Sequence, residues 1–323
     1  MSSLRLIVTS SIAAFAITAC HRQSAGDDHT SHMSGADKAA PRAVASASAR
    51  DMSLPPSNNN AKARLAATPR HAEWVKVAWE PASPDSLMAW IVYPSTSNAK
   101  TPVVVVVHEI FGLSSWVRGV ADQVAADGFI AIAPDLESRV RGGPSTEELS
   151  GDSARKLIQG VSYAERNKGI VAVARYAMSQ PSAAPRYAVI GYCWGGSTVW
   201  SHVIDGGVPG FVGGVAYYGL PYMSGAVPIA DSLAKISKPV VLLNGSKDAR
   251  IASAMPAVDS MMKALGKTYV GKNYEGAVHG FLRAQDDPKS PTRDEAEEQA
   301  NLAATRDAWP RTLDFLRKNL GSR

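Results

Sequence analysis

A short apolar run at residues 189–190 leads into the motif Gly191-Tyr192-Cys193-Trp194-Gly195 and then into a stretch of helical character. This order predicts a nucleophile elbow, a sharp turn from a strand into a helix with the cysteine held at the bend in a strained backbone conformation. Glycines two residues before and after Cys193 let strand and helix approach without a side-chain collision. The first N–H groups of the helix then point at the thiol and favour negative charge there. The pattern predicts Cys193 as a nucleophile; the alternative is a buried structural cysteine beside a glycine-rich turn.

The first 70 residues differ in character from the rest of the 323-residue chain. Residues 1–20 contain one basic residue, Arg5, then the apolar run 6–17, and end in Ile17-Thr18-Ala19-Cys20. This pattern resembles the lipobox of bacterial lipoproteins and predicts a signal peptide, too short to span a membrane, with Cys20 acylated. An ordinary cleaved signal peptide is the alternative. We therefore expect an exported, periplasmic protein held at the membrane by a lipid anchor.

Residues 21–70 are rich in Ser, Ala, Asn, Asp and Pro and show no sustained apolar period, so we expect a disordered tether. They carry seven Lys or Arg and four Asp or Glu, a net charge of +3. Residues 71–323 carry 26 Lys or Arg and 25 Asp or Glu, a net charge of +1, so nucleic acid is not an expected partner of this domain. The remaining length, about 250 residues, suits one α/β domain with a large core.

Strand and helix patterns alternate along residues 71–323. Apolar runs predict strands at residues 73–79, 87–93, 102–110, 129–134, 189–193, 212–218, 240–244 and 269–274. Helical spacing covers residues 116–127, 170–178 and 293–320, the last interrupted or bent at Pro310. Five consecutive valines in the third strand indicate a central parallel strand. We expect an α/β fold with a mostly parallel central sheet and helices on both faces, and loop and cap elements in the insertion 139–160.

A cysteine nucleophile needs a base, and the domain has four histidines, at positions 71, 108, 202 and 279. In α/β-hydrolases the chain order is nucleophile, acid, histidine. His202 falls inside the helix that the elbow starts, which suits packing, so His279 in a late loop is the predicted base. Asp248 lies just past the carboxyl end of the strand 240–244 and is the predicted acid, which would fix the imidazole tautomer. The alternatives are a solvated loop histidine and a turn-forming aspartate.

These features together resemble the dienelactone hydrolases, also called carboxymethylenebutenolidases. The similarity covers residues 75–320 and rests on the cysteine elbow, H-E-I-F-G at 108–112, A-P-D-L at 133–136, Asp248 after a strand, H-G-F at 279–281 and T-L-D-F-L at 312–316. The resemblance implies the α/β-hydrolase fold and hydrolysis of an ester or lactone through a thioester acyl-enzyme, with no cofactor.

The resemblance also implies a role for individual residues. It assigns a catalytic triad to Cys193, His279 and Asp248. It makes Glu109 the group that contacts the thiol and receives its proton as substrate binds. It places the oxyanion hole at the backbone N–H groups of Ile110 and Trp194. We expect no metal, because the zinc motif H-E-x-x-H would need a histidine where the chain has Gly112.

Two arginines, Arg139 and Arg283, stand where family members hold the carboxylate of their substrate. Because a guanidinium binds a carboxylate through two parallel hydrogen bonds, we expect a small carboxylate-bearing ester or lactone as substrate. We also expect the enzyme to be a monomer. Trp194, the insertion 139–160 and the membrane anchor depart from the cytoplasmic members. Two alternatives remain: a broad carboxylesterase or thioesterase for neutral substrates, and a catalytically silent lipoprotein that binds a ligand.

Overall fold

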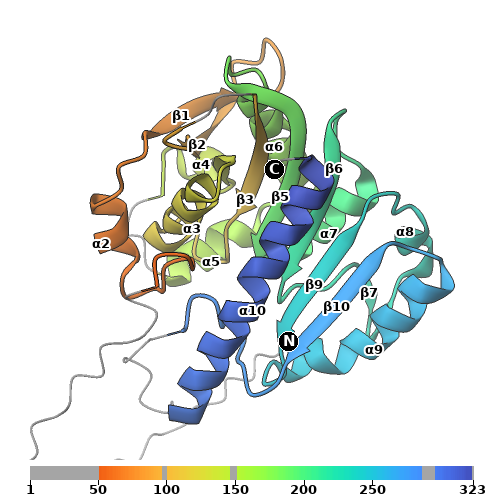
Figure 1. Cartoon of the computed structure of the whole chain (residues 1–323). Coiled ribbons are helices and arrows are strands. Elements are labelled where there is room, and N and C mark those ends of the chain that lie inside the picture. Colours follow the sequence, from red (N-terminus) through yellow and green to blue (C-terminus); the bar gives the residue numbers. More distant parts are fainter. Residues whose placement is uncertain (1–50, 97–99, 146–150, 286–294, 322–323) are drawn as a thin grey trace, which may run out of the picture. The chain divides into compact units, whose positions relative to one another are not determined.

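Figure 1 shows the computed structural model, which describes residues 51–96, 100–145, 151–285 and 295–321. Its central sheet has eight strands in the order β1-β2-β4-β3-β5-β6-β9-β10. These strands are β1 Ala72–Ala78, β2 Ser86–Val92, β3 Thr101–Val107, β4 Ile130–Asp135, β5 Ala183–Tyr192, β6 Phe211–Tyr217, β9 Val240–Gly245 and β10 Tyr269–Tyr274. Strand β2 is antiparallel to β1 and β4, and the remaining pairs are parallel. The predicted fold class is therefore confirmed.

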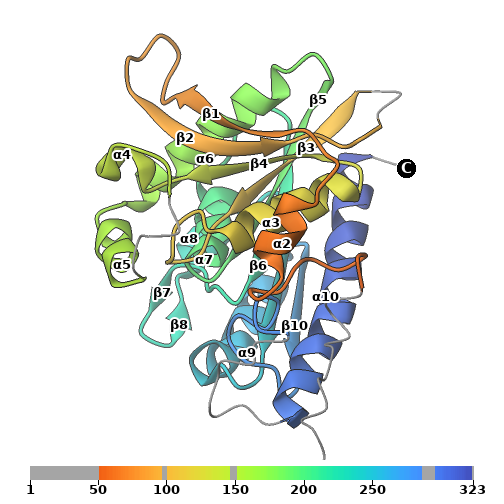
Figure 2. The same ribbon diagram turned by 90° about the vertical axis from the view of Figure 1, so that its left-hand side faces the viewer.

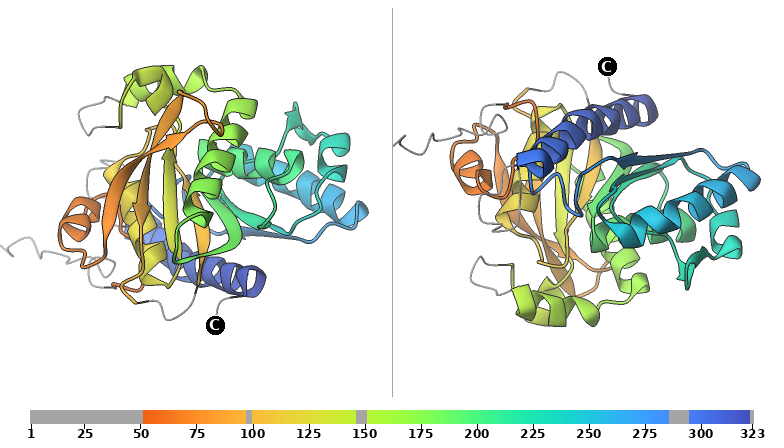
Figure 3. Two further views of the ribbon diagram at one scale, coloured as in Figure 1. Left: turned by 90° about the horizontal axis from the view of Figure 1, so that it is seen from above. Right: turned by 90° about the horizontal axis from the view of Figure 1, so that it is seen from below.

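Helices cover both faces of this sheet. The helices are α2 Ala61–Ala66, α3 Ser115–Ala126, α4 Ser138–Arg141, α5 Gly151–Gln159, α6 Tyr163–Met178, α7 Trp194–Asp205, α8 Ala230–Ala234, α9 Ala249–Ala264 and α10 Glu295–Leu320. Figure 3 shows α3 and α10 on one face and α6, α7 and α9 on the other. Because both faces are covered, all seven residues of β3 are buried, as its run of valines predicts. Helix α10 continues across Pro310, so the interruption predicted there does not occur.

The segment 51–70 differs from the disordered tether expected up to residue 70. Leu54 is buried in the core, and α2 lies beside α3 (Figure 2). The Trp116 indole N–H donates to the carbonyl of Pro56 at 2.9 Å, and the Asn58 N–H donates to the carbonyl of Arg283 at 2.9 Å. Consecutive prolines leave this segment little backbone freedom to lose on ordering. The predicted boundary between tether and domain, at residue 70, therefore lies too far along the chain. The predicted signal peptide 1–20, Cys20 and residues 21–50 lie outside the described residues and stay predictions.

Two short insertions follow strands of the sheet. The predicted insertion 139–160 includes most of α4 and all of α5, although its residues 146–150 lie outside the described part. After β6, the chain forms a hairpin of β7 Met223–Ser224 and β8 Val227–Pro228 and then α8, which sequence patterns did not predict. Among the helices of the described residues, none is both long and apolar enough to cross a membrane.

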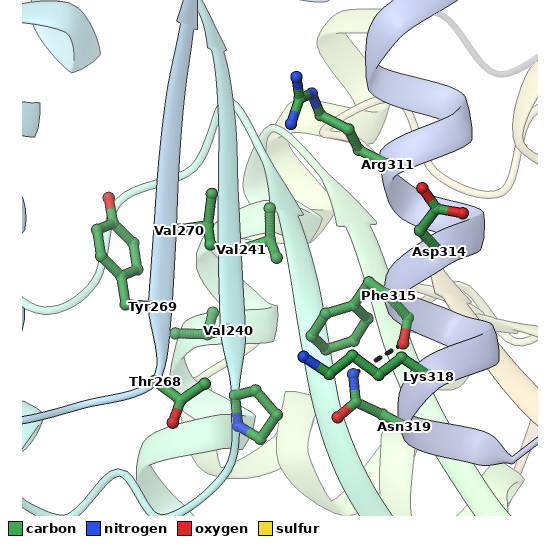
Figure 4. Close-up of a pocket in the computed structure, with 11 residues that line it drawn as sticks. Val240, Val241, Thr268, Tyr269, Val270, Arg311, Asp314, Phe315, Lys318 and Asn319 are labelled. Carbon is green, nitrogen blue, oxygen red and sulfur yellow. Dashed lines mark hydrogen bonds between the residues drawn. The ribbon is translucent and has the colours of Figure 1, made fainter.

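A groove of about 320 Å³ lies at the amino ends of β9 and β10. Its lining is Pro239–Val241 and Thr268–Val270 from these strands and Arg311, Asp314, Phe315, Lys318 and Asn319 from α10. Figure 4 shows the α10 side chains along the two strands. Because β3, β5, β6, β9 and β10 run in parallel, the segments that follow them meet at the opposite, carboxyl edge. The predicted site residues that the structure describes follow strands that end at that carboxyl edge, and none of these residues lines the groove.

Candidate active site

Cys193 occupies the bend between β5 and α7 with φ 57° and ψ −113°. Positive φ is rare for a residue with a Cβ and costs on the order of 1–3 kcal/mol, so the surrounding structure must hold it. Its N–H donates to the carbonyl of Tyr217 at 3.0 Å, and its carbonyl accepts from the N–H of Ser197 at 3.1 Å. The first bond fixes the bend to the end of β6 and the second to the first turn of α7. The strained elbow predicted from the sequence is thus present.

The two glycines of the motif are required by close backbone contacts. A Cβ on Gly191 would lie 2.3 Å from the carbonyl oxygen of Gly195. A Cβ on Gly195 would lie 2.4 Å from the carbonyl oxygen of Val107, at the end of β3. Real Cβ atoms do not come so close to another backbone, so alanine at either position would push the elbow away from the sheet.

His279 and Asp248 meet at the carboxyl edge of the sheet. The Nδ1 atom of His279 lies 2.5 Å from Oδ2 of Asp248. Asp248 is the N-cap of α9, where its side chain accepts from the N–H of Ile251 at 3.3 Å. Burial lowers the pKa of His279, but hydrogen bonds to the side chains of Asp248 and Cys193 outweigh burial and raise this pKa to about 9. The structure therefore brings together all three residues of the predicted triad.

The loop that carries His279 is held by residues on either side of it. The Oδ1 atom of Asn301, on α10, accepts from the N–H of Val278 at 3.0 Å. The Oγ atom of Ser246 accepts from the N–H of Gly276 at 2.8 Å. A Cβ on Gly245 would lie 2.4 Å from the carbonyl oxygen of Ala277, so only glycine lets the end of β9 approach this loop so closely. These contacts fix the spacing between the acid and the imidazole.

Glu109 forms a buried ion pair. Its Oε2 atom lies 3.0 Å from Nε of Arg283, and its side chain is 3% exposed. The guanidinium of Arg283 also lies 5.4 Å from the ring centre of Phe111. Of the two arginines expected to bind substrate, Arg283 therefore lies at the site, four residues after His279, and holds Glu109. The predicted contact of Glu109 with the thiol stays a prediction.

His108 fixes the peptide that leads to Ile110. Its Nε2 accepts from the N–H of Leu136 at 3.2 Å, so the proton is on Nδ1, which donates to the carbonyl of Glu109 at 2.7 Å. In a trans peptide the N–H points opposite to the carbonyl, so this bond also sets the direction of the Ile110 N–H. Trp194 is the first residue of α7, where an N–H has no acceptor within the helix. Within the described residues, neither the Ile110 N–H nor the Trp194 N–H donates to a backbone carbonyl.

Arg139 makes its contacts elsewhere. Its guanidinium pairs with Asp85 at 3.2 Å and with Glu165 at 3.8 Å, and lies 4.0 Å from the ring centre of Trp79. None of these three partners belongs to the predicted site. With two carboxylates beside it, Arg139 already has counter-ions from the turn between β1 and β2 and from α6. Its predicted role in binding substrate has no support in these contacts.

Tyr218 is a site residue that the motifs did not indicate. It follows β6 with φ 40°, it is fully buried, and its ring centre lies 4.9 Å from that of His279. Its hydroxyl has no hydrogen-bond partner among the described residues. Burial raises the pKa of Tyr218 well above its usual range, and nearby Glu109 raises it further, so the phenol keeps its proton. Its place just past the carboxyl end of a buried strand is the signal that also indicated Asp248.

Comparisons with known proteins agree on one family. The model of the dienelactone hydrolase family matches residues 87–320. A Synechocystis protein named "Putative carboxymethylenebutenolidase" is 29% identical over 231 residues, which cover 68% of this chain and 87% of that protein. The carboxymethylenebutenolidase of Pseudomonas putida is 27% identical over 194 residues, which cover 58% and 78%. A Klebsiella pneumoniae crystal structure described as a "Putative Dienelactone Hydrolase" has a TM-score of 0.61 at 23% identity, covering 78% of this chain and 100% of that one; this likeness concerns the fold.

The contact between His279 and Asp248 predicts how the imidazole titrates. In the native protein, we expect the His279 NMR signal, assigned by its loss in His279→Gln, to titrate near pH 9. Asp248→Asn removes the carboxylate that favours the imidazolium, so the midpoint should fall by about one pH unit or more. Asp231→Asn, at an exposed aspartate of α8, is the matched control and should leave the midpoint in place. A titration midpoint in Asp248→Asn equal to that of the native protein would show that the side chains of Asp248 and His279 do not interact in solution.

Proposed function

The chain belongs to the dienelactone hydrolase family and is a hydrolase of ester or lactone bonds, and we propose that it works through a thioester on Cys193. The observation that carries this proposal is the meeting of Cys193, His279 and Asp248 at the carboxyl edge of the sheet. A thiol at a strained elbow, an imidazole in contact with it and a carboxylate behind the ring are the three parts that nucleophilic acyl transfer needs.

The reaction follows from these positions in two halves. In the first, the Cys193 thiolate attacks the acyl carbon, and the N–H groups of Ile110 and Trp194 stabilise the resulting oxyanion. The His279 imidazolium gives its proton to the leaving oxygen as the carbon–oxygen bond breaks, which leaves a thioester. In the second half, neutral His279 takes a proton from water, the hydroxide adds to the thioester, and the thiolate departs as the acid forms. Asp248 stabilises each imidazolium.

The ion pair between Glu109 and Arg283 supports a role for substrate charge in starting this reaction. A substrate carboxylate that binds Arg283 competes with Glu109 for the same guanidinium. Glu109, freed from its partner and still buried, then becomes a stronger proton acceptor, because an unpaired buried carboxylate favours its protonated form. We propose that it takes the thiol proton at this point. The thiolate would thus form only when a carboxylate-bearing substrate is bound, which protects it from oxidation at other times.

Replacement of the sulfur tests the proposed nucleophile. Cys193→Ala should lower the turnover of small activated esters by roughly a thousandfold or more, as loss of a nucleophile does in other acyl-transfer enzymes. Thermal unfolding should show that the variant is folded, because alanine keeps the Cβ and the backbone of the elbow. Turnover at the native rate in folded Cys193→Ala would rule out the thioester.

A pair of esters tests the proposed carboxylate. The p-nitrophenyl esters of glutaric acid and of pentanoic acid have acyl chains of equal length, and only the first ends in a carboxylate. Arg283→Gln should lower kcat/KM for the glutarate ester by about tenfold or more relative to the pentanoate ester, since a charge-assisted hydrogen bond is lost. An equal change for both esters would remove carboxylate recognition and favour a broad carboxylesterase.

A further inference from the structure

Arg166 is an arginine in the first two turns of α6 with no counter-ion in the described part of the chain. Its Nε donates to the carbonyl of Val161 at 3.1 Å, and no carboxylate of a described residue lies within ion-pair distance. Its guanidinium lies 4.2 Å from the ring centre of Tyr163 and 4.1 Å from that of Trp194. The charge is therefore held by aromatic rings, one carbonyl and a hydrogen bond to the side chain of Tyr163, and it is half-buried. Burial lowers the pKa of Arg166, which reflects the cost of keeping this cation away from water.

The position of Arg166 is tied to the nucleophile through Trp194. Trp194 directly follows Cys193, and its N–H is one of the two proposed oxyanion donors. Its indole stacks on the imidazole of His108, with ring centres 5.5 Å apart and planes 10° apart, and His108 sets the other oxyanion donor. The guanidinium of Arg166 thus packs on the side chain of the residue that directly follows the nucleophile. The stack fixes the indole and, with it, the cation.

Helix stability does not explain an arginine at this position. Ser162 and Glu165 form a capping box at the start of α6, which already stabilises the helix. A cation near a helix N-terminus is disfavoured by the helix dipole, whereas a nearby anion is favoured. The exposed Lys168, two residues later, pairs with Glu80 at 2.7 Å, so acidic partners are available to other cations of the same helix. Arg166 instead lies on the ring of Trp194, the first residue after the elbow cysteine.

We propose that Arg166, stacked on Trp194, is a specificity residue that binds the carboxylate of the substrate, in the role expected for Arg139. This inference rests on the proposed function and adds to it, beside Arg283, a second residue that selects an anionic substrate. A planar guanidinium supported on an indole presents its terminal N–H groups in a fixed orientation, which suits a carboxylate. Arg139 lacks this freedom because Asp85 and Glu165 already neutralise it. The pairing also gives a reason for tryptophan beside the nucleophile.

The experiment compares the glutarate and pentanoate esters in three single variants. Arg166→Gln should lower the ratio of kcat/KM for the anionic ester to kcat/KM for the neutral ester by about tenfold or more, mainly through a higher KM for the anionic ester. Arg139→Gln should leave this ratio at its native value. Arg175→Gln, which removes the same charge from an exposed position on the same helix, is the matched control and should also leave the ratio in place.

Two results would overturn the proposal. A native ratio in Arg166→Gln, with the variant folded by thermal unfolding, would show that Arg166 does not read the carboxylate. A fall of the ratio in Arg139→Gln alone would return this role to Arg139. Both differ from failure of the proposed function itself, in which the native protein hydrolyses neither ester or Cys193→Ala hydrolyses both at the native rate.

Discussion

The structure depends on one strained residue, Cys193, which is held with positive φ between β5 and α7. A cysteine does not adopt this conformation for its own stability, so neighbouring elements must impose it. Gly195 packs against the end of β3, and the Cys193 N–H is bound to the end of β6. The two strands that flank β5 therefore set the bend. Because the sheet fixes the elbow, the thiol and the first N–H of α7 have a defined direction before any substrate arrives, which is the preorganisation that acyl transfer requires.

Charge at the site is arranged in two pairs that act differently. Asp248 holds the imidazole of His279 and favours its protonated form. In the proposed function, this imidazolium stabilises the thiolate and then protonates the leaving group. Arg283 neutralises Glu109, which is buried and would otherwise be costly in its charged form. The first pair needs no rearrangement for chemistry, whereas the second is sensitive to any competing anion. In the proposed function, this difference separates the permanent catalytic groups from the substrate-dependent step.

The sequence predicted the parts of the site that follow from chain order and missed those that follow from packing. Cys193, Asp248 and His279 each follow or precede a strand in a fixed order, so parallel strands bring them to one edge. Position relative to a motif did not indicate where Arg139 points, because its direction depends on how α4 turns after β4. The contact of Arg166 with Trp194 joins two helices and has no local pattern. The ordered segment 51–70 was missed for a similar reason: Leu54 and Pro56 gain their contacts from α3, far along the chain.

The thioester itself is the most direct test of this account. The native enzyme is mixed with an excess of an activated ester, quenched with acid during turnover and digested, and the peptide containing Cys193 is weighed by mass spectrometry. We predict that this peptide carries the mass of the acyl group, that hydroxylamine removes it, and that it accumulates in His279→Gln, where water is not activated. An unmodified Cys193 peptide throughout turnover, with the acyl group absent or on another residue, would contradict the account.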